Sequence, residues 1–292
     1  MRFLVLGGTG MLGQAVVAEA RSRGWDALGL SREQADITDR DRLLAWAGEF
    51  RPDVVVNCAA FTRVDDCEAE QERAFAVNGE AVAHAAAAAE SAGARLVHVS
   101  TDYVFDGEAH EPYREDAPTA PRSVYGQSKL AGERRALACD GSLVVRTSWL
   151  FGPGGPNFVA TMVGLIEAGK LPLRVVRDQE GCPTYAPFLA AALLDLARLG
   201  ATGIVHYRNR EPVSWYAFAA EIARLWRAGP PGEIEVVPVT TAEFPRPAPR
   251  PAYSVLDVTR FEEITRRRVE PWREGLEETL ARLRELRKGR KQ

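Results

Sequence analysis

The N-terminus carries a glycine-rich turn in a setting that restricts the fold strongly. The apolar run Arg2–Leu6 is predicted to be a strand, and it is followed by Gly-Gly-Thr-Gly-Met-Leu-Gly at 7–13 and an amphipathic helix at 11–24. Gly7, Gly10 and Gly13 allow a tight turn, a close approach to a pyrophosphate and close packing of helix on strand. The first helical turn offers unpaired N–H groups to that pyrophosphate. A strand, this glycine spacing and a helix in succession predict a dinucleotide-binding site.

Apolar and amphipathic segments alternate along the first half of the chain. Further strands are expected at Asp26–Leu30, 53–59, 95–100, 142–148 and 203–207, and further helices at Arg40–Phe50, 69–93, Val124–Leu137 and 187–199. The run at 53–59 is almost continuously hydrophobic, which is typical of a parallel strand covered on both faces. This alternation predicts an α/β fold with a Rossmann-like, doubly wound parallel sheet and right-handed crossovers.

Beyond about residue 151 the alternation is less regular. Helices are expected at 157–168, 215–228 and 274–287, and a short strand at Leu173–Val176. In the stretch 245–251, prolines alternate with other residues, including Arg246 and Arg250, and we interpret it as an extended connector. The last residues, 287–292, are expected to be solvated or frayed.

The charge balance and the cysteine pattern exclude several classes of protein. The 292 residues include 37 Lys and Arg against 40 Asp and Glu, a net charge of −3, so no overall field attracts nucleic acid. No apolar run reaches the ~18 residues of a membrane span, and the run at 3–6 is too short for a signal peptide. The four cysteines form no C-x-x-C pair and no Cys/His cluster with zinc spacing. We expect a cytoplasmic protein with no metal and no nucleic-acid or membrane partner.

Residues after the second and third strands bear on the choice of cofactor. Arg32 follows the second strand, where an acidic residue would bind the ribose 2′-hydroxyl of NAD and an arginine accommodates the 2′-phosphate of NADPH. Arg32 therefore favours NADPH and leaves NADH open. Asp36 and Ile37 come next and are expected at the adenine edge. Ala59 and Ala60 end the third strand in small side chains, so the backbone can approach the cofactor closely.

Tyr125 and Lys129 lie four residues apart in the predicted helix Val124–Leu137, so their side chains share one face. A free phenol, with a pKa near 10, is a poor acid or base at neutral pH. A nearby ammonium favours the phenolate and lowers that pKa, so Lys129 is expected to make Tyr125 an effective proton donor. The alternative is an exposed pair without a catalytic role, and the glycine turn upstream argues against it.

Thr101 and Asp102 come at the end of the strand predicted at 95–100. Ligands of parallel sheets bind at the carboxyl ends of the strands. The Thr101 hydroxyl is expected to hydrogen-bond the substrate oxygen that Tyr125 protonates. Asp102 is expected to bind a sugar hydroxyl or to tune that network.

Together these motifs resemble the extended short-chain dehydrogenase/reductase family and, within it, the dTDP-4-dehydrorhamnose reductases. The glycine turn and the Tyr/Lys pair occur across the superfamily. Thr-Asp-Tyr-Val-Phe at 101–105 and Arg-Thr-Ser-Trp at 146–149 are much narrower. The resemblance spans nearly the whole chain, with further matching segments at 35–39, 57–68, 124–133, 181–184 and 250–256.

The resemblance implies that NAD(P)H reduces the 4-keto group of a dTDP-4-keto-6-deoxy sugar, with Tyr125 as proton donor and Lys129 and Thr101 assisting. It implies pyrophosphate contacts at Gly10, Met11 and Leu12, adenosine contacts at Asp36 and Ile37, a cofactor wall of Ala60, Phe61 and Thr62, and sugar-nucleotide contacts at Thr101, Asp102 and Trp149. It also implies a cofactor-binding domain of residues 1–150, with 183–207 crossing back, and a substrate-binding domain of 151–182 and 208–292. A homodimer follows from analogy alone.

The chain departs from the family pattern at three places. Some relatives bind magnesium through glutamates at a dimer interface, one of them directly after the glycine turn, where this chain has Gln14 and Ala15. No magnesium is therefore expected. Phe61 replaces a histidine, so a polar cofactor contact is expected to be lost. Cys182 stands where a smaller or plainer residue is common, and its role is left open.

Two other functions are compatible with the fold. A sugar-nucleotide epimerase would retain its cofactor instead of consuming it. Dehydratases carry Asp-Glu after the threonine, whereas this chain has Asp102 and Tyr103. A non-catalytic regulatory subunit of methionine adenosyltransferase resembles the chain at 103–133, but the segments at 146–149 and 181–184 favour a reductase.

Overall fold

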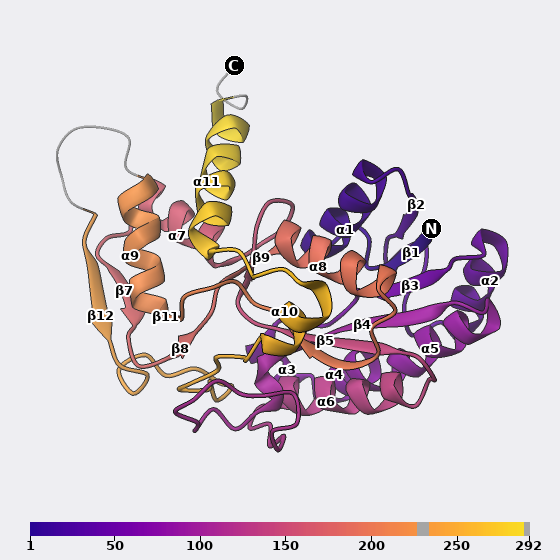
Figure 1. Cartoon of the computed structure of the whole chain (residues 1–292). Coiled ribbons are helices and arrows are strands. Elements are labelled where there is room, and N and C mark those ends of the chain that lie inside the picture. Colours follow the sequence, from indigo (N-terminus) through magenta and orange to yellow (C-terminus); the bar gives the residue numbers. More distant parts are fainter. Residues whose placement is uncertain (227–233, 289–292) are drawn as a thin grey trace.

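The computed structural model describes residues 1–226 and 234–288, and its largest feature is a six-stranded sheet (Figure 1). The strand order is β10-β5-β4-β3-β1-β2, and every neighbouring pair is parallel. The strands are β1 (Arg2–Leu6), β2 (Asp26–Leu30), β3 (Val54–Asn57), β4 (Arg95–Thr101), β5 (Leu143–Thr147) and β10 (Gly203–His206). The predicted doubly wound, Rossmann-like sheet is confirmed.

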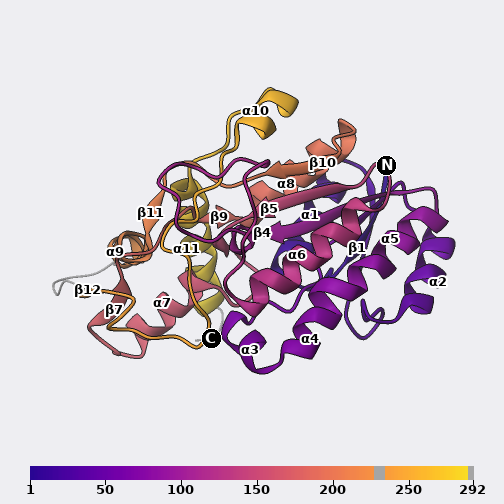
Figure 2. The ribbon, with the colours of Figure 1, turned by 90° about the horizontal axis from the view of Figure 1, so that it is seen from below.

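Helices cover both faces of the sheet (Figures 1 and 2). On one face α1 (Met11–Ser22) and α8 (Ala186–Arg198) pack on strand residues such as Val5, Val56 and Val145. On the other, α2 (Arg40–Phe50), α5 (Ala81–Ser91) and α6 (Val124–Leu137) pack over the alternate residues, such as Leu4, Val55 and Val144. Successive side chains of a strand point to opposite faces, so the continuous apolar strands supply both cores.

The helix expected at 69–93 is the clearest correction to the sequence interpretation. The segment forms α3 (Val64–Ala69), α4 (Gln71–Phe75), the π-helical turn η1 (Ala76–Glu80) and α5. Asn78 within η1 is buried, and its side chain binds both backbone groups of Phe61, at 2.7 and 3.0 Å, and Ser128 Oγ at 3.1 Å. These tertiary hydrogen bonds accompany the wider turn, and π-turns are frequent at functional sites.

A smaller unit lies beside the carboxyl ends of the strands (Figures 1 and 2). It holds α7 (Phe158–Glu167), α9 (Trp215–Trp226) and α11 (Trp272–Lys288), whereas α10 (Thr259–Thr265) packs back on α8 and β10 of the large sheet. It also holds three strand pairs: β7 (Leu173–Val176) with β12 (Val236–Val239), β8 (Glu180–Gly181) with β11 (Val213–Ser214), and β6 (Leu150–Phe151) with β9 (Thr184–Tyr185). The helix expected at 215–228 is found as far as residue 226, and 227–228 and 289–292 lie outside the described residues.

The stretch at 245–251 contains no helix or strand, in line with its interpretation as a connector. It returns to the sheet, where Arg250 Nη2 donates to Asp65 Oδ1 of α3 at 2.8 Å. The chain continues between two other segments, since Tyr253 N donates to Gly107 O at 3.0 Å and Glu180 N to Ala252 O at 2.8 Å.

Within the part of the chain that the structure describes, none of the helices has the length and apolar character needed to cross a bilayer.

Candidate active site

The glycine turn joins β1 to α1 at the carboxyl edge of the sheet. Gly7 has φ +72°, and a Cβ on Gly13 would lie only 2.2 Å from Gly7 O. No other residue type fits at 13 without moving the turn. Gly10 is the N-cap of the twelve-residue α1 and has no side chain to occupy the helix terminus. The free N–H groups of this terminus therefore face an open space suited to an anion.

A cavity of about 220 Å³ adjoins this turn on the β2 side. It is lined by eight of the predicted cofactor residues: Gly7, Gly10, Arg32, Asp36, Ile37, Ala59, Ala60 and Phe61. Arg32 Nε lies 2.9 Å from Asp36 Oδ2, and Thr38 donates to Asp36 Oδ1 from its hydroxyl at 2.7 Å. Burial acts to raise the pKa of Asp36, but the hydrogen bonds from Thr38 and Arg32 lower it below its usual value. Asp36 is therefore an anion at neutral pH.

Arg73 lies in the same cavity and was missed in the sequence. Its guanidinium lies 4.6 Å from the centre of the Phe61 ring, and that of Arg63 lies 5.4 Å from it on the same ring. Both guanidiniums also pair with Glu70, Arg73 at 2.6 Å and Arg63 at 3.7 Å. Arg73 belongs to α4. The sequence predicted one continuous helix at 69–93, and that prediction gave no reason to expect Arg73 beside the glycine turn.

The helix α6 starts beside the end of β4. The Ser123 side chain caps it by accepting a hydrogen bond from Gly126 N at 3.1 Å. A Cβ on Gly126 would lie 2.2 Å from Tyr103 O, so this glycine lets the helix approach the turn after β4 closely. The Tyr103 ring meets the Tyr125 ring edge to face, with centroids 5.5 Å apart. Lys129, one turn further on, donates from Nζ to Val99 O of β4 at 2.7 Å.

Thr101 and Asp102 form a short hydrogen-bonded chain beside Tyr125. Thr101 Oγ1 donates to Asp102 Oδ1 at 2.9 Å and accepts from Tyr103 N at 3.3 Å. Asp102 is almost fully buried, and Oδ2 has no hydrogen-bond partner among the described residues. Burial raises the pKa of Asp102 to about 6, and the nearby hydroxyls of Ser254 and Thr101 oppose this only in part.

The expected lowering of the Tyr125 pKa by Lys129 is not found. Burial raises the pKa of Tyr125 above its usual value, and a hydrogen bond with Thr101 opposes this only in part. Burial lowers the pKa of Lys129 to about 8, against the attraction of Glu133. The spacing did place both residues on one face, but the ammonium is directed at the Val99 carbonyl. Tyr125 is accordingly a protonated phenol at neutral pH.

A second cavity, of about 490 Å³, holds the remaining predicted residues. They are Met11, Leu12, Gly13, Thr62, Thr101, Asp102, Tyr125, Lys129 and Trp149, with Gly10 and Ala60 shared between the two cavities. The structure thus brings every predicted site residue to one of two adjoining hollows. Residues that the sequence interpretation did not select also line the larger one, among them Cys58, Tyr103, Pro156 and Trp215.

Trp215 is the most informative of these additions. Its ring stacks on that of Trp149, with centroids 3.6 Å apart and planes 7° from parallel. Trp149 has φ +45°, and Gly181 leaves room for its indole, since a Cβ there would lie 2.5 Å from Cε2. Cys182 is buried, its carbonyl accepts from Ser148 Oγ at 2.8 Å, and burial raises the pKa of its thiol to about 12. Residues 181–182 therefore support Trp149.

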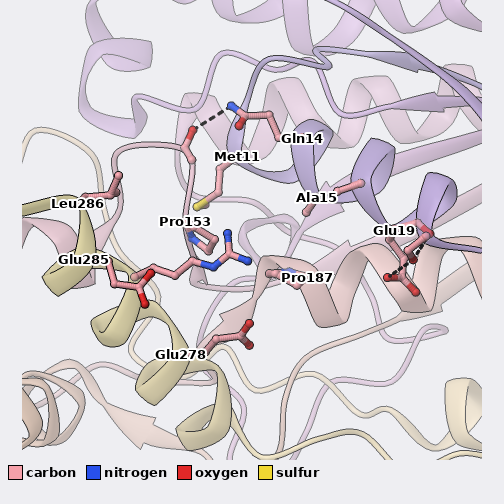
Figure 3. Close-up of a pocket in the computed structure, with 13 residues that line it drawn as sticks. Met11, Gln14, Ala15, Glu19, Pro153, Pro187, Glu278, Glu285 and Leu286 are labelled. Carbon is pink, nitrogen blue, oxygen red and sulfur yellow. Dashed lines mark hydrogen bonds between the residues drawn. The ribbon is translucent and has the colours of Figure 1, made fainter. Parts of the chain in front are cut away.

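Another hollow, of about 880 Å³, lies outside the predicted site, between α1, the loop after β6 and α11 (Figure 3). Met11 lines both this hollow and the larger site cavity. Gln14 Nε2 donates to Thr9 O at 2.6 Å and to Gly154 O at 3.2 Å. Gln14 thereby ties the 153–156 loop to the glycine turn. Pro156 of that loop lines the site.

Comparisons with known proteins agree with this geometry. A family model described as RmlD substrate binding domain matches residues 1–285. A dTDP-4-dehydrorhamnose reductase of Streptomyces griseus is 46% identical over 285 residues, which is 95% of this chain and 92% of that protein. The crystal structure of a dTDP-4-dehydrorhamnose reductase from Clostridium acetobutylicum has TM-score 0.89 and 40% identity, covering 97% of this chain and 100% of the other. One from Bacillus anthracis, in complex with NADP, has TM-score 0.89 and 34% identity, covering 96% and 99%.

Proposed function

The chain belongs to the RmlD substrate binding domain family, and we propose that it reduces the 4-keto group of a dTDP-4-keto-6-deoxy sugar, with dTDP-4-dehydrorhamnose giving dTDP-rhamnose. The observation that carries the proposal is the meeting of Tyr125, Lys129 and Thr101 in a cavity that adjoins the glycine turn. The names of relatives at 46% and 40% identity support the choice of substrate.

The residues present fit an NADP cofactor. The α1 terminus suits a pyrophosphate, and Arg32 lines the smaller cavity with a side chain that is 69% exposed, so its guanidinium would turn from Asp36 to meet a 2′-phosphate. Arg73 adds a second cation there. When bound, the nicotinamide supplies hydride to the carbonyl carbon. Cys58 and Ala60, which border both cavities, leave space for a ligand that spans them.

Tyr125 acts as the acid in this proposal. Its phenol is protonated at neutral pH because burial raises its pKa. An alkoxide that forms as the carbonyl is reduced is a far stronger base than a phenolate, so it takes the Tyr125 proton. Thr101 turns its hydroxyl hydrogen from Asp102 to the same oxygen, and the Lys129 ammonium stabilises the phenolate left behind. These interactions are strongest in the transition state, so they raise kcat more than they tighten binding.

The substrate side of the cavity combines a flat apolar wall with one buried acid. The stacked indoles of Trp149 and Trp215 offer a surface on which a sugar or a base packs. Asp102 lines this cavity and is the acid that binds a sugar hydroxyl in this proposal. In this proposal residues 1–150 and 183–207 bind the cofactor, and residues 151–182 and 208–292 close over the sugar nucleotide.

The test is to incubate the purified chain with a panel of dTDP-4-keto-6-deoxy sugars and with NADPH or NADH. Loss of absorbance at the reduced nicotinamide band should match the substrate consumed, and NMR should show a new hydroxyl at C4. An epimerase would change the sugar without net cofactor oxidation. A regulatory subunit would turn over no keto sugar at all, and either result would overturn the proposal.

A further inference from the structure

A row of polar side chains crosses the sheet beneath α6. The parallel register sets Ser100 of β4 beside Arg146 of β5, and Arg146 beside His206 of β10. All three are buried. Neighbouring residues on adjacent strands point to the same face, so the row is a direct result of the register.

Glu133 of α6 lies against this row and is bound at both carboxylate oxygens. Ser100 Oγ donates to Oε1 at 2.6 Å, and Arg146 donates from Nε to Oε1 at 2.9 Å and from Nη2 to Oε2 at 2.7 Å. The side chains of Glu133 and Arg146 are 1% and 3% exposed. Two parallel hydrogen bonds from a guanidinium give a carboxylate a single orientation. Glu133 is therefore held rigidly under the helix.

Glu133 stands one helical turn beyond Lys129 on the same face of α6. We propose that Glu133 is a positioning residue for Lys129: held by Arg146 and Ser100 one turn along the helix, its carboxylate keeps the buried ammonium charged, while the Val99 carbonyl sets the direction of that ammonium. The inference rests on the part in reduction proposed for Lys129. A buried ion pair is seldom more stabilising than apolar packing of the same volume, so the Glu133–Arg146 pair calls for a role besides stability.

The groups that face Lys129 come from three elements. Tyr125 and Glu133 share its helix, Cys58 follows β3, and His98 belongs to β4. Burial raises the pKa of Cys58 to about 12 and lowers the pKa of His98 far below its usual value, so both are uncharged at neutral pH. Glu133 is then the anion among them that offsets the burial of Lys129.

The buried charges also match the proposed reaction. Burial and Arg146 lower the pKa of His206 to about 3, so this histidine is neutral. Glu115 borders the row, accepting from Arg146 Nη1 at its carbonyl (3.4 Å) and from His206 N at its carboxylate (3.0 Å). Lys129 is the cation of this group that lines the cavity, so the phenolate left when Tyr125 gives up its proton forms in the same cavity as an ammonium.

The chain's four lysines, Lys129, Lys170, Lys288 and Lys291, make a direct test practical. The pH dependence of acetic anhydride labelling, read by peptide mass spectrometry, reports the ionisation of each amine without any substrate. Removing the anion disfavours the charged form of Lys129. In Glu133→Gln we expect the half-labelling pH of Lys129 to fall by about one unit, roughly tenfold in ionisation constant, with Lys170 unchanged. The alkaline limb of the pH profile of kcat should shift to lower pH by a similar amount.

Two variants separate positioning from simple loss of structure. Asp195 also pairs with arginines, Arg23 at 2.6 Å and Arg267, but it lies on α8. Asp195→Asn should lower the melting temperature and leave Lys129 labelling as in the wild type. Glu133→Asp keeps a carboxylate, so the half-labelling pH of Lys129 should stay within about half a pH unit of the wild-type value.

If the Glu133→Gln variant folds and the half-labelling pH of Lys129 is unchanged in it, the inference is overturned. If Glu133→Gln does not fold, Glu133→Asp decides. A half-labelling pH of Lys129 that stays near the wild-type value in Glu133→Asp supports the proposal. A fall of a full pH unit in that variant contradicts it, because the carboxylate is still present. Failure of the proposed function gives a different pattern. The wild type would then turn over no keto sugar, while the labelling shift between variants would still appear.

Discussion

Replacing Gly181 by alanine tests whether the Trp149–Trp215 pair forms the substrate side of the cavity. A Cβ at 181 would lie 2.5 Å from Trp149 Cε2 and 2.7 Å from Nε1, closer than side chains approach one another in proteins. The same indole packs on Trp215 at a centroid distance of 3.6 Å. The Trp149 ring must therefore leave its stacked position.

The expected effect follows from the energy of the stack. An aligned aromatic pair contributes about 0.5–1.5 kcal/mol beyond the burial of its surface. If the sugar nucleotide binds the stacked arrangement, losing this energy lowers the population competent to bind, and the apparent dissociation constant rises in proportion. We expect KM for the sugar nucleotide to rise roughly 2- to 13-fold. The Kd for NADPH should stay the same, because the glycine turn is untouched.

Steady-state kinetics at saturating NADPH measure KM for the sugar nucleotide, and fluorescence titration measures the Kd for NADPH. Far-ultraviolet circular dichroism should show a weaker exciton couplet from the paired indoles. Gly164→Ala is the matched control, since nothing lies within 4 Å of a Cβ at that position in α7. An unchanged KM in Gly181→Ala, with the couplet lost, would refute the role of the indole pair in binding.

Three other substitutions probe separate parts of the site. Tyr125→Phe removes the proposed acid and should lower kcat by about 10²–10⁴-fold while the Kd for NADPH is unchanged, and an active variant would remove Tyr125 from the mechanism. Arg32→Ala should weaken NADPH about tenfold and NADH hardly at all, because its exposed guanidinium would meet only the 2′-phosphate; equal losses would contradict this. Burial raises the pKa of Asp102 to about 6, so the folded chain binds this proton more tightly than the unfolded chain and loses stability as the pH rises from about 4 to 6. Asp102→Asn should abolish this pH-dependent loss of unfolding free energy, which is roughly 3 kcal/mol at most, and urea denaturation at each pH measures it. If the wild type and Asp102→Asn lose the same stability between about pH 4 and 6, another group is responsible.

The elements of the sheet could be predicted because each depends on neighbours in the sequence. The strands at 2–6, 26–30 and 143–147 are short apolar runs, and their burial on both faces follows from covering helices. The prediction of one continuous helix at 69–93 was wrong because the conformation of this segment depends on residues far away in the sequence. Asn78 binds Phe61 and Ser128, partners 17 and 50 residues away, and no local pattern contains that information.

The site divides in the same way. The glycine turn and the Tyr125–Lys129 spacing are local, so the sequence placed both side chains on one face of α6. The direction of the Lys129 ammonium and the pKa of Tyr125 are not local. The first depends on the Val99 carbonyl of another strand, and the second on burial by the surrounding protein. The expected effect of one on the other was therefore wrong.

By itself the sequence determined the strand–turn–helix that suits a dinucleotide and the tyrosine and lysine one turn apart, because backbone geometry makes these short-range patterns act alike in any surroundings. Only the tertiary structure decided that Trp215 stacks on Trp149, that Arg73 enters the cofactor cavity and that Glu133 is held by Arg146. Those contacts depend on strand register and crossovers that join segments far apart in the chain, and the charges of the buried groups depend on how completely the fold removes water from them.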